Sequence, residues 1–179
     1  LSNISIEFKF TPCVGRSHGI HAEPMSFGLK IALWHEEIKR HIERIDQVID
    51  ISSVGMVSGP VGTHATVPLE IEEEVCKELG LKPAPITNQI IQRDRHADVL
   101  QRLALIASSL EKFSTEIRSL QRTEINEIQE PFGEPGFVST GSSSMPHKRN
   151  PELTERICGI SRVIRSNSYV ALELSLIHI

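Results

Sequence analysis

Two long stretches with a helical spacing of apolar residues constrain the fold of this chain more than any other feature. Each stretch repeats an apolar side chain every three or four residues. The first stripe lies between residues 25 and 52 and consists of Phe27, Ile31, Trp34, Ile38, Ile42, Ile45 and Ile49. The second lies between about residues 88 and 129 and consists of Leu100, Leu103, Ile106, Leu110, Phe113, Ile117 and Leu120. This spacing predicts two long amphipathic helices whose apolar faces form the core of a bundle.

Proline and glycine positions predict the remaining elements. Pro68 is expected to begin a short helix that ends near Gly80, and Asn150 and Pro151 are expected to cap and begin a last helix reaching about Leu174. Residues 1–24 are expected to be a short polar segment followed by a Gly- and Pro-rich loop, and residues 130–149 are expected to form a loop.

The predicted fold class is therefore all-α, a long antiparallel helical bundle. No long alternating pattern of the kind that predicts strands is present. An unbroken helix over residues 88–129 would be about 60 Å long. Such a helix is too long for a 179-residue domain to cover alone, so it predicts packing against other subunits.

Composition excludes several functional classes. The chain has 19 Lys and Arg against 23 Asp and Glu, a formal net charge of −4, whereas general nucleic-acid binders normally carry a basic excess. Three widely spaced cysteines (Cys13, Cys76 and Cys158) exclude a disulfide scaffold and a CxxC zinc site, and favour a reducing cytoplasm. No apolar run approaches the roughly 20 residues of a membrane span. We expect a cytoplasmic protein without nucleic-acid or membrane partners.

Three segments between the predicted helices carry side chains suited to chemistry. Residues 15–24 contain His18, which exchanges protons near neutral pH. Together with His21 and Glu23, His18 could suggest a metal site, but the surrounding Gly and Pro residues would not align ligands as a helix does, so no metal is expected. Residues 87–98 place charges of both signs at the start of a helix, which alone indicates only a solvated first turn.

The third segment, residues 141–152, places serine hydroxyls, two cations and a helix N-terminus in succession. Lys148 and Arg149 directly precede the predicted helix start at Asn150 and Pro151. A helix N-terminus carries free N–H groups and about half a positive charge. This combination is suited to holding a carboxylate or a phosphate.

Residues 141–151 read Gly-Ser-Ser-Ser-Met-Pro-His-Lys-Arg-Asn-Pro, a run that resembles the signature loop of the fumarase/aspartase superfamily. The His-Lys-Arg form is similar to that of the adenylosuccinate lyase family. Residues 15–24 and 92–98 match further segments of that family, with Ser17 where the family usually has Thr. The resemblance implies that residues 1–174 are the central helical-bundle domain of an incomplete chain, without its N-terminal and C-terminal domains. Residues 175–179 are expected to be a non-native tail.

The resemblance also implies an activity. Members of this family are C–N lyases of purine biosynthesis. They eliminate fumarate from adenylosuccinate, giving AMP, and from the succinyl-carboxamide ribotide SAICAR, giving AICAR, without a metal or organic cofactor. They are homotetramers whose active sites combine different subunits, so the fragment alone is expected to be inactive. Two alternatives stay open, namely another lyase of the superfamily, such as an argininosuccinate lyase, and a non-catalytic helical assembly protein.

The residue roles come from the same resemblance. Ser142 is expected to be the catalytic base, His18 to act as the acid or orient one, and Glu155 to pair with His18. The expected substrate-binding residues are Ser17, Gln89, Ser143, Lys148, Asn150 and Arg156, of which Gln89 binds the succinyl group and Arg156 the phosphate side. A serine hydroxyl is a poor base, so Lys148 and the helix N-terminus are expected to favour its ionisation. Ser143 stays open as an alternative base.

Overall fold

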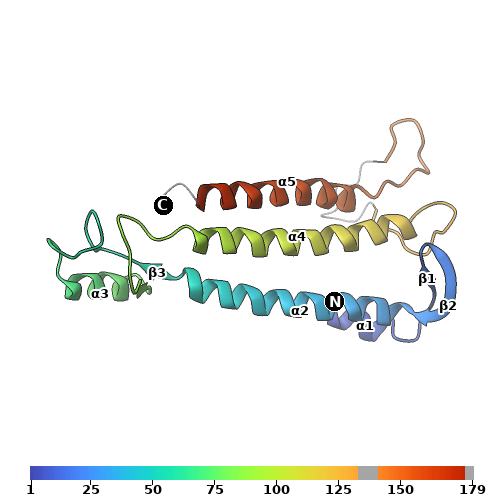
Figure 1. Ribbon diagram of the computed structural model, residues 1–179. Helices are drawn as coiled ribbons and strands as arrows, with labels where there is room; N and C mark the ends of the chain where they lie inside the picture. Colours follow the sequence, from blue (N-terminus) through green and yellow to red (C-terminus); the bar gives the residue numbers. More distant parts are fainter. Residues whose placement is uncertain (133–140, 176–179) are drawn as a thin grey trace. The chain divides into compact units, whose positions relative to one another are not determined.

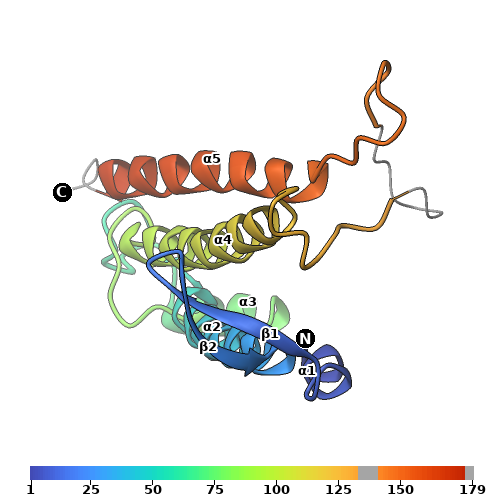
Figure 2. The ribbon, with the colours of Figure 1, turned by 90° about the vertical axis from the view of Figure 1, so that its right-hand side faces the viewer.

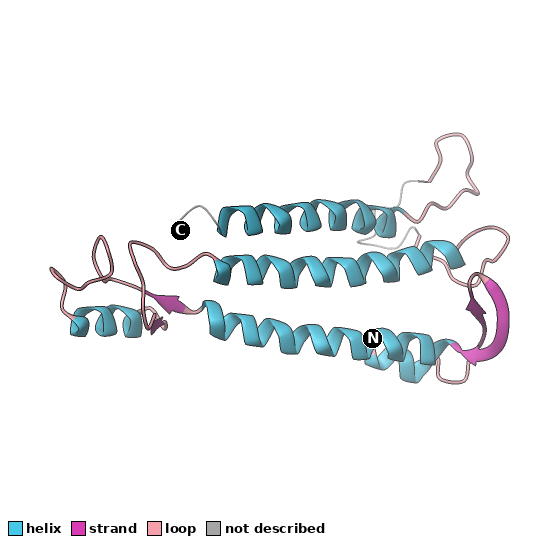
Figure 3. Ribbon diagram, in the orientation of Figure 1, coloured by secondary structure: helices cyan, strands magenta, loops and turns pink. Residues whose placement is uncertain are grey.

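The computed structural model describes residues 1–132 and 141–175, and these are mostly helical (Figures 1 and 3). The elements in chain order are α1 (Ser2–Glu7), β1 (Pro12–Ser17), β2 (Ile20–Ser26), α2 (Phe27–Ser52), β3 (Val54–Gly55), α3 (Leu69–Glu78), β4 (Lys82–Pro83), α4 (Asp94–Leu120) and α5 (Glu152–Ser175). The predicted all-α class is confirmed. Part of the expected loop, residues 133–140, and residues 176–179 of the expected tail lie outside the described residues.

The chain divides into two compact units, and α2, α4 and α5 each contribute to both. The first unit comprises residues 1–41 and 105–164, and the second comprises residues 42–104 and 165–179. Within the first unit, neighbouring helices run antiparallel (Figure 1). Almost all the residues expected to form the active site belong to this first unit.

An aromatic core between α2 and α4 holds the first unit together. Ile31, Trp34 and Phe113 are buried there, and the Trp34 and Phe113 rings stack with their centroids 4.8 Å apart. Burying side chains of this size stabilises a fold by about 1.5–3 kcal/mol each. The short helix α1 packs against the start of α2, where Phe8 meets Phe27 edge-on at 5.7 Å between ring centroids.

Residues 12–26, expected to be a loop, form an antiparallel hairpin of β1 and β2 beside α1 (Figure 2). Ser17 pairs with Ile20, so His18 and Gly19 make a two-residue turn with φ angles of 54° and 79°. Two consecutive positive φ angles are typical of a type I′ turn, whose twist matches that of the strands. The loop prediction was wrong because the Gly and Pro residues here mark this turn and an irregular register near Gly15 rather than irregular chain.

The observed helix boundaries correct three predictions. Helix α4 spans 27 residues, about 40 Å, rather than the roughly 40 residues expected. Before it, the Asn88 side chain accepts a hydrogen bond from the Ile90 N–H at 3.0 Å and forms a turn, and after it Asn126 takes a φ of 51°. Helices α3 and α5 begin at Leu69 and Glu152, one residue later than Pro68 and Pro151.

The predicted stripes form the core only in part. In α2 the buried face includes His41 and Val48, whereas Ile42 and Ile49 are 57% and 54% exposed. In α4, Leu103 and Leu110 are also exposed, while smaller side chains such as Ala104 and Ala107 are buried. Part of each long apolar stripe is therefore exposed rather than packed against the described residues.

The second unit is held by small side chains and short polar contacts. Its buried apolar residues are Val48, Cys76, Ala84, Ala97, Ala104 and Ala171. Strands β3 and β4 pair in parallel, and Lys82 in β4 reaches Asp50 in α2 at 2.5 Å. The Gln101 side chain of α4 donates a hydrogen bond to the Ser168 carbonyl of α5 at 2.9 Å.

Candidate functional site

The hydroxyl of Ser142 is held by the backbone of its own loop. Its Oγ accepts hydrogen bonds from the N–H groups of Ser144 and Met145 at 3.3 and 3.2 Å. Hydrogen bonds donated to an oxygen favour its ionised form. The turn formed by residues 142–145 therefore supplies local help for the deprotonation that a serine base needs.

The start of α5 is capped by a side chain that the sequence analysis did not identify. The buried carboxylate of Glu130 accepts hydrogen bonds from the N–H groups of Leu153 and Thr154, at 3.2 and 3.0 Å, and from the Thr154 hydroxyl at 2.5 Å. These N–H groups are therefore not available to a substrate anion or to an ionised Ser142. The expected electrostatic help from this helix end is wrong for these two donors, because a carboxylate already neutralises them.

The cations of the signature loop differ in their surroundings. Arg149 lies over the Phe132 ring, 5.0 Å from its centroid, and its carbonyl accepts a hydrogen bond from Gln121. Lys148 is exposed, and its backbone N–H donates to the Met145 carbonyl at 3.0 Å. Both cations are exposed, so both present their charge to solvent after the serine turn.

Glu155 and Arg156, in the first turns of α5, are exposed and lie near opposite charges. The Glu155 carboxylate lies 3.8 Å from the Arg118 guanidinium, and Arg156 lies 3.9 Å from Glu152. The expected pairing of Glu155 with His18 is not among the contacts of the described residues of this single chain. Asn150, just before the helix, accepts a backbone hydrogen bond from Glu152 at 3.0 Å.

His18 and Ser17 lie at the exposed tip of the hairpin. Arg16, directly before them, forms an ion pair of 2.5 Å with Glu127, from the segment after α4. The Arg16 hydrogen bond lowers the pKa of the Glu127 carboxyl and, in turn, raises the pKa of Arg16. The Arg16–Glu127 pair holds the strand just before the hairpin tip, while the His18 side chain stays exposed to solvent.

Gln89 belongs to the second unit. It is the middle residue of the turn closed by the Asn88 side chain, and it is exposed. The nine predicted site residues are all exposed or half-buried, namely Ser17, His18, Gln89, Ser142, Ser143, Lys148, Asn150, Glu155 and Arg156. The hairpin and the signature loop reach the same end of the first unit (Figure 1), but no contact among the described residues joins His18 to Ser142.

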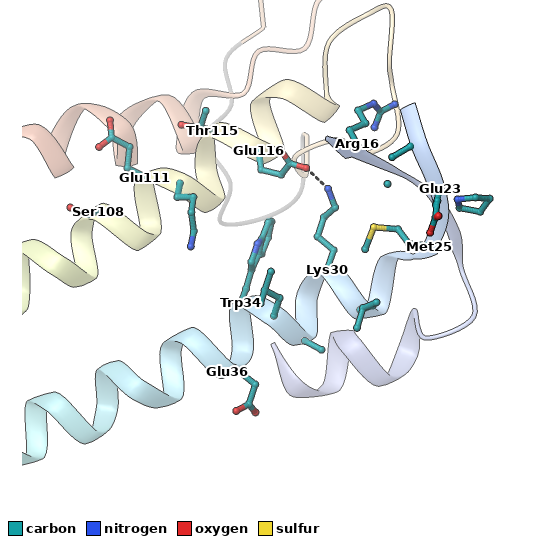
Figure 4. Close-up of a pocket in the computed structure, with 17 residues that line it drawn as sticks. Arg16, Glu23, Met25, Lys30, Trp34, Glu36, Ser108, Glu111, Thr115 and Glu116 are labelled. Carbon is teal, nitrogen blue, oxygen red and sulfur yellow. Dashed lines mark hydrogen bonds and ion pairs between the residues drawn. The ribbon is translucent and has the colours of Figure 1, made fainter. Parts of the chain in front are cut away.

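An open groove of about 1430 Å³ lies elsewhere in the first unit, between the hairpin, α2 and α4 (Figure 4). Its charged residues include Arg16 and the ion pair of Lys30 with Glu116. None of the nine predicted site residues lines it. Sequence reasoning missed Lys30 and Glu116 because they flank helical stripes, where charges normally mark a solvated face.

Within residues 1–132 and 141–175, no group of three or more His, Cys, Asp or Glu side chains is arranged to hold a metal ion. None of the helices described combines the length and apolar character that crossing a membrane requires.

The sequence of this chain matches a known protein family and several of its members. A family model described as "Lyase" matches residues 1–166. The adenylosuccinate lyase of Bacillus subtilis is 53% identical over 167 residues, which cover 93% of this chain and 38% of that protein. The adenylosuccinate lyase of Pyrococcus abyssi is 56% identical over 165 residues, covering 90% of this chain and 36% of that protein. The chain thus spans well under half the length of these relatives.

Solved structures agree with the sequence relatives. A fumarate lyase from Mesorhizobium sp. BNC1 superposes with a TM-score of 0.83 at 29% identity, covering 98% of this chain and 38% of that chain. The 3-carboxy-cis,cis-muconate lactonizing enzyme from Pseudomonas putida gives a TM-score of 0.81 at 28% identity, covering 94% of this chain and 36% of that chain. The chain belongs to the lyase family of the fumarase/aspartase superfamily.

Proposed function

We propose that this chain is the central helical domain of an adenylosuccinate lyase. The full protein would release fumarate from adenylosuccinate to give AMP, and from SAICAR to give AICAR, in the cytoplasm and without a cofactor. The observation that most supports this proposal is the Ser142 hydroxyl, which accepts hydrogen bonds from two backbone N–H groups within a fully matched signature loop. The adenylosuccinate lyases matched over at least 90% of this chain support the choice of substrate.

The proposed reaction is a β-elimination. Ser142, ionised with the help of the two N–H donors and of nearby Lys148, removes a proton from the carbon next to a succinyl carboxylate. The electron pair left on that carbon forms the double bond of fumarate as the C–N bond breaks. His18, or an acid that it orients, donates a proton to the departing nitrogen. Negative charge grows on the carboxylate during this step, so cations and fixed donors stabilise the transition state.

The proposed active site is shared between subunits of a homotetramer. The predicted residues are exposed or half-buried in a single chain, and their segments come from both compact units. An elimination that depends on electrostatic stabilisation needs a site shielded from water. Neighbouring copies would supply that shielding and would cover the exposed apolar side chains of α5. Residues 1–174 would form the shared domain, and residues 175–179 would lie outside it.

The test is to assay the full-length protein on three substrates. Purified protein is incubated separately with adenylosuccinate, argininosuccinate and malate, and fumarate release is measured by its absorbance. We expect turnover of adenylosuccinate alone. Turnover of argininosuccinate or malate would assign the chain to another lyase of the superfamily, and no turnover of any of the three would favour a helical assembly protein.

A further inference from the structure

The position of Gln89 depends on a loop that the proposed reaction does not use. This glycine loop, residues 58–64, is closed by a hydrogen bond from the His64 N–H to the Ser58 carbonyl at 3.0 Å. It packs against residues 87–88, directly before Gln89. The contact between the two segments is close enough to fix where Gln89 stands.

Gly62 makes the closest part of this contact. Its φ is 77°, a left-handed conformation that side chains disfavour. A Cβ atom at this position would lie 2.0 Å from the Thr87 carbonyl oxygen and 2.8 Å from the Thr87 carbonyl carbon. Any residue other than glycine must therefore displace the backbone of Thr87, and with it the turn that presents Gln89.

Hydrogen bonds fix the same two segments. The buried Ser58 hydroxyl, 1% exposed, lies 2.6 Å from the Thr87 hydroxyl and 3.5 Å from the Asn88 carbonyl. The Asn88 side chain then accepts the Ile90 N–H, so that Gln89 is the middle residue of that turn. A chain of contacts thus runs from the glycine loop to Gln89.

The glycine loop is itself anchored on α3 by a buried carboxylate. Glu72, 4% exposed, accepts a hydrogen bond from the Val57 N–H at 2.6 Å, just before the loop. At the end of the loop, the His64 ring lies 3.8 Å from the same carboxylate. One side chain of α3 therefore holds both ends of the loop that supports residues 87–88.

We propose that Gly62 and Ser58 are positioning residues that set the place of Gln89 for binding the succinyl arm of the substrate. The inference rests on the proposed function for the role of Gln89, but the contact with Thr87 does not depend on that role. Replacing Gly62 displaces the turn at residues 87–90, so that Gln89 no longer meets the succinyl group.

The experiment compares Gly62→Ala with Gly80→Ala in the full-length protein. Gly80 also has a positive φ, 68°, but a Cβ there meets no atom within 4 Å, so this control carries the conformational strain without the collision. Ser58→Ala removes the hydroxyl contact without a collision and serves if Gly62→Ala fails to fold. Hydrogen exchange at the Ile90 amide measures the turn directly, without any substrate.

We expect exchange at Ile90 to be about tenfold faster or more in Gly62→Ala and to stay at the wild-type rate in Gly80→Ala. Equal exchange in the two variants would overturn the proposal. In kinetics, Gly62→Ala should lower kcat/KM for adenylosuccinate by about tenfold or more, and adding Gln89→Ala to it should cost little further. If the losses in kcat/KM from Gly62→Ala and Gln89→Ala simply added in the double variant, the proposal would also be overturned. If the wild-type protein were inactive on adenylosuccinate, the proposed function would be refuted. The exchange rate at Ile90 would then decide this inference by itself.

Discussion

A single serine hydroxyl illustrates how the chemistry of this chain depends on backbone geometry. A serine acts as a base only if its ionised form is stabilised, and two N–H groups of its own turn donate hydrogen bonds to Ser142, the proposed base. The helix N-terminus was expected to share that task, but Glu130 occupies its donors at Leu153 and Thr154. Among the described residues, the N–H groups of Ser144 and Met145 are the backbone donors seen on the Ser142 hydroxyl.

Replacing Ser142 by Ala in the full-length protein should lower turnover of adenylosuccinate by at least about 100-fold, because it removes the proposed base. Steady-state kinetics measures the loss, and size-exclusion chromatography with light scattering checks that assembly is intact. Ser144→Ala, which removes a neighbouring hydroxyl 3.3 Å away but leaves the Ser142 oxygen in place, should lose far less. A large loss in Ser143→Ala with only a few-fold loss in Ser142→Ala would move the base to Ser143.

At the scale of elements, periodicity was enough to predict the two long helices α2 and α4 but not all their ends or their partners, and helix α1 was not predicted. The stripe from Phe27 to Ile49 predicted α2 within two residues at its start. The ends of α4 were missed because Asn88 and Asn126, rather than Gly or Pro, turn the chain there. The hairpin was missed because a type I′ turn at His18 and Gly19 has the same composition as an irregular loop.

The candidate site shows the same division between local and distant information. The signature loop was recognisable because its residues are contiguous in the sequence. The Glu130 cap on Thr154 joins residues 24 positions apart, and the Arg16–Glu127 pair joins residues 111 positions apart. Such pairs depend on how helices and loops pack, which a single sequence does not record.

A polar network ties α2 to α4 beside the aromatic core. The Ser109 hydroxyl donates to Glu37 at 2.5 Å, and His41 Nε2 lies 2.8 Å from the same hydroxyl. Since the Ser109 proton goes to Glu37, the His41 ring must be the donor to Ser109. Lys112 also donates to Glu37, so the carboxylate joins the two helices through two partners on α4.

This network predicts a pH dependence of stability. Burial raises the pKa of Glu37, but the hydrogen bonds from Lys112 and Ser109 outweigh it and lower the pKa below its ordinary value of 4.5. A carboxyl group with a lowered pKa stabilises the fold above its unfolded pKa, and this contribution is lost as the pH falls through the folded value. Glu37→Gln should therefore lower the urea midpoint at pH 7, and its difference from wild type should shrink below about pH 4.5.

The matched control for this pH series is Glu36→Gln. It removes one negative charge from the neighbouring position, whose side chain is 56% exposed and pairs with Lys39 on the same helix. Exposed pairs of this kind contribute less than about 1 kcal/mol. The urea midpoints of both variants are measured from pH 7 down to pH 3. If the two variants gave the same midpoint at every pH, the α2–α4 network would add no stability beyond that of an exposed ion pair.

At the scale of the whole molecule, exposed apolar side chains indicate contact with other chains. In α5, Ile160 and Val163 are each 59% exposed, and in α2 Ile42 and Ile49, seven residues apart, are 57% and 54% exposed. Scattered exposed apolar residues are normal, but rows of them at helical spacing mark surfaces that associate. The proposed site needs the same partners, because its residues are open to solvent in a single chain.

A lysine at position 163 should therefore weaken assembly. Ile160 and Val163 lie three residues apart, so they share one face of α5, and a charge buried there on association is costly. In the full-length protein, Val163→Lys is expected to shift the mass measured by light scattering towards smaller species and to lower turnover in parallel. Thr123→Lys adds the same charge at an exposed polar residue and should leave the mass unchanged. If Val163→Lys retained the wild-type mass at low micromolar concentration, this face of α5 would not be part of the proposed interface.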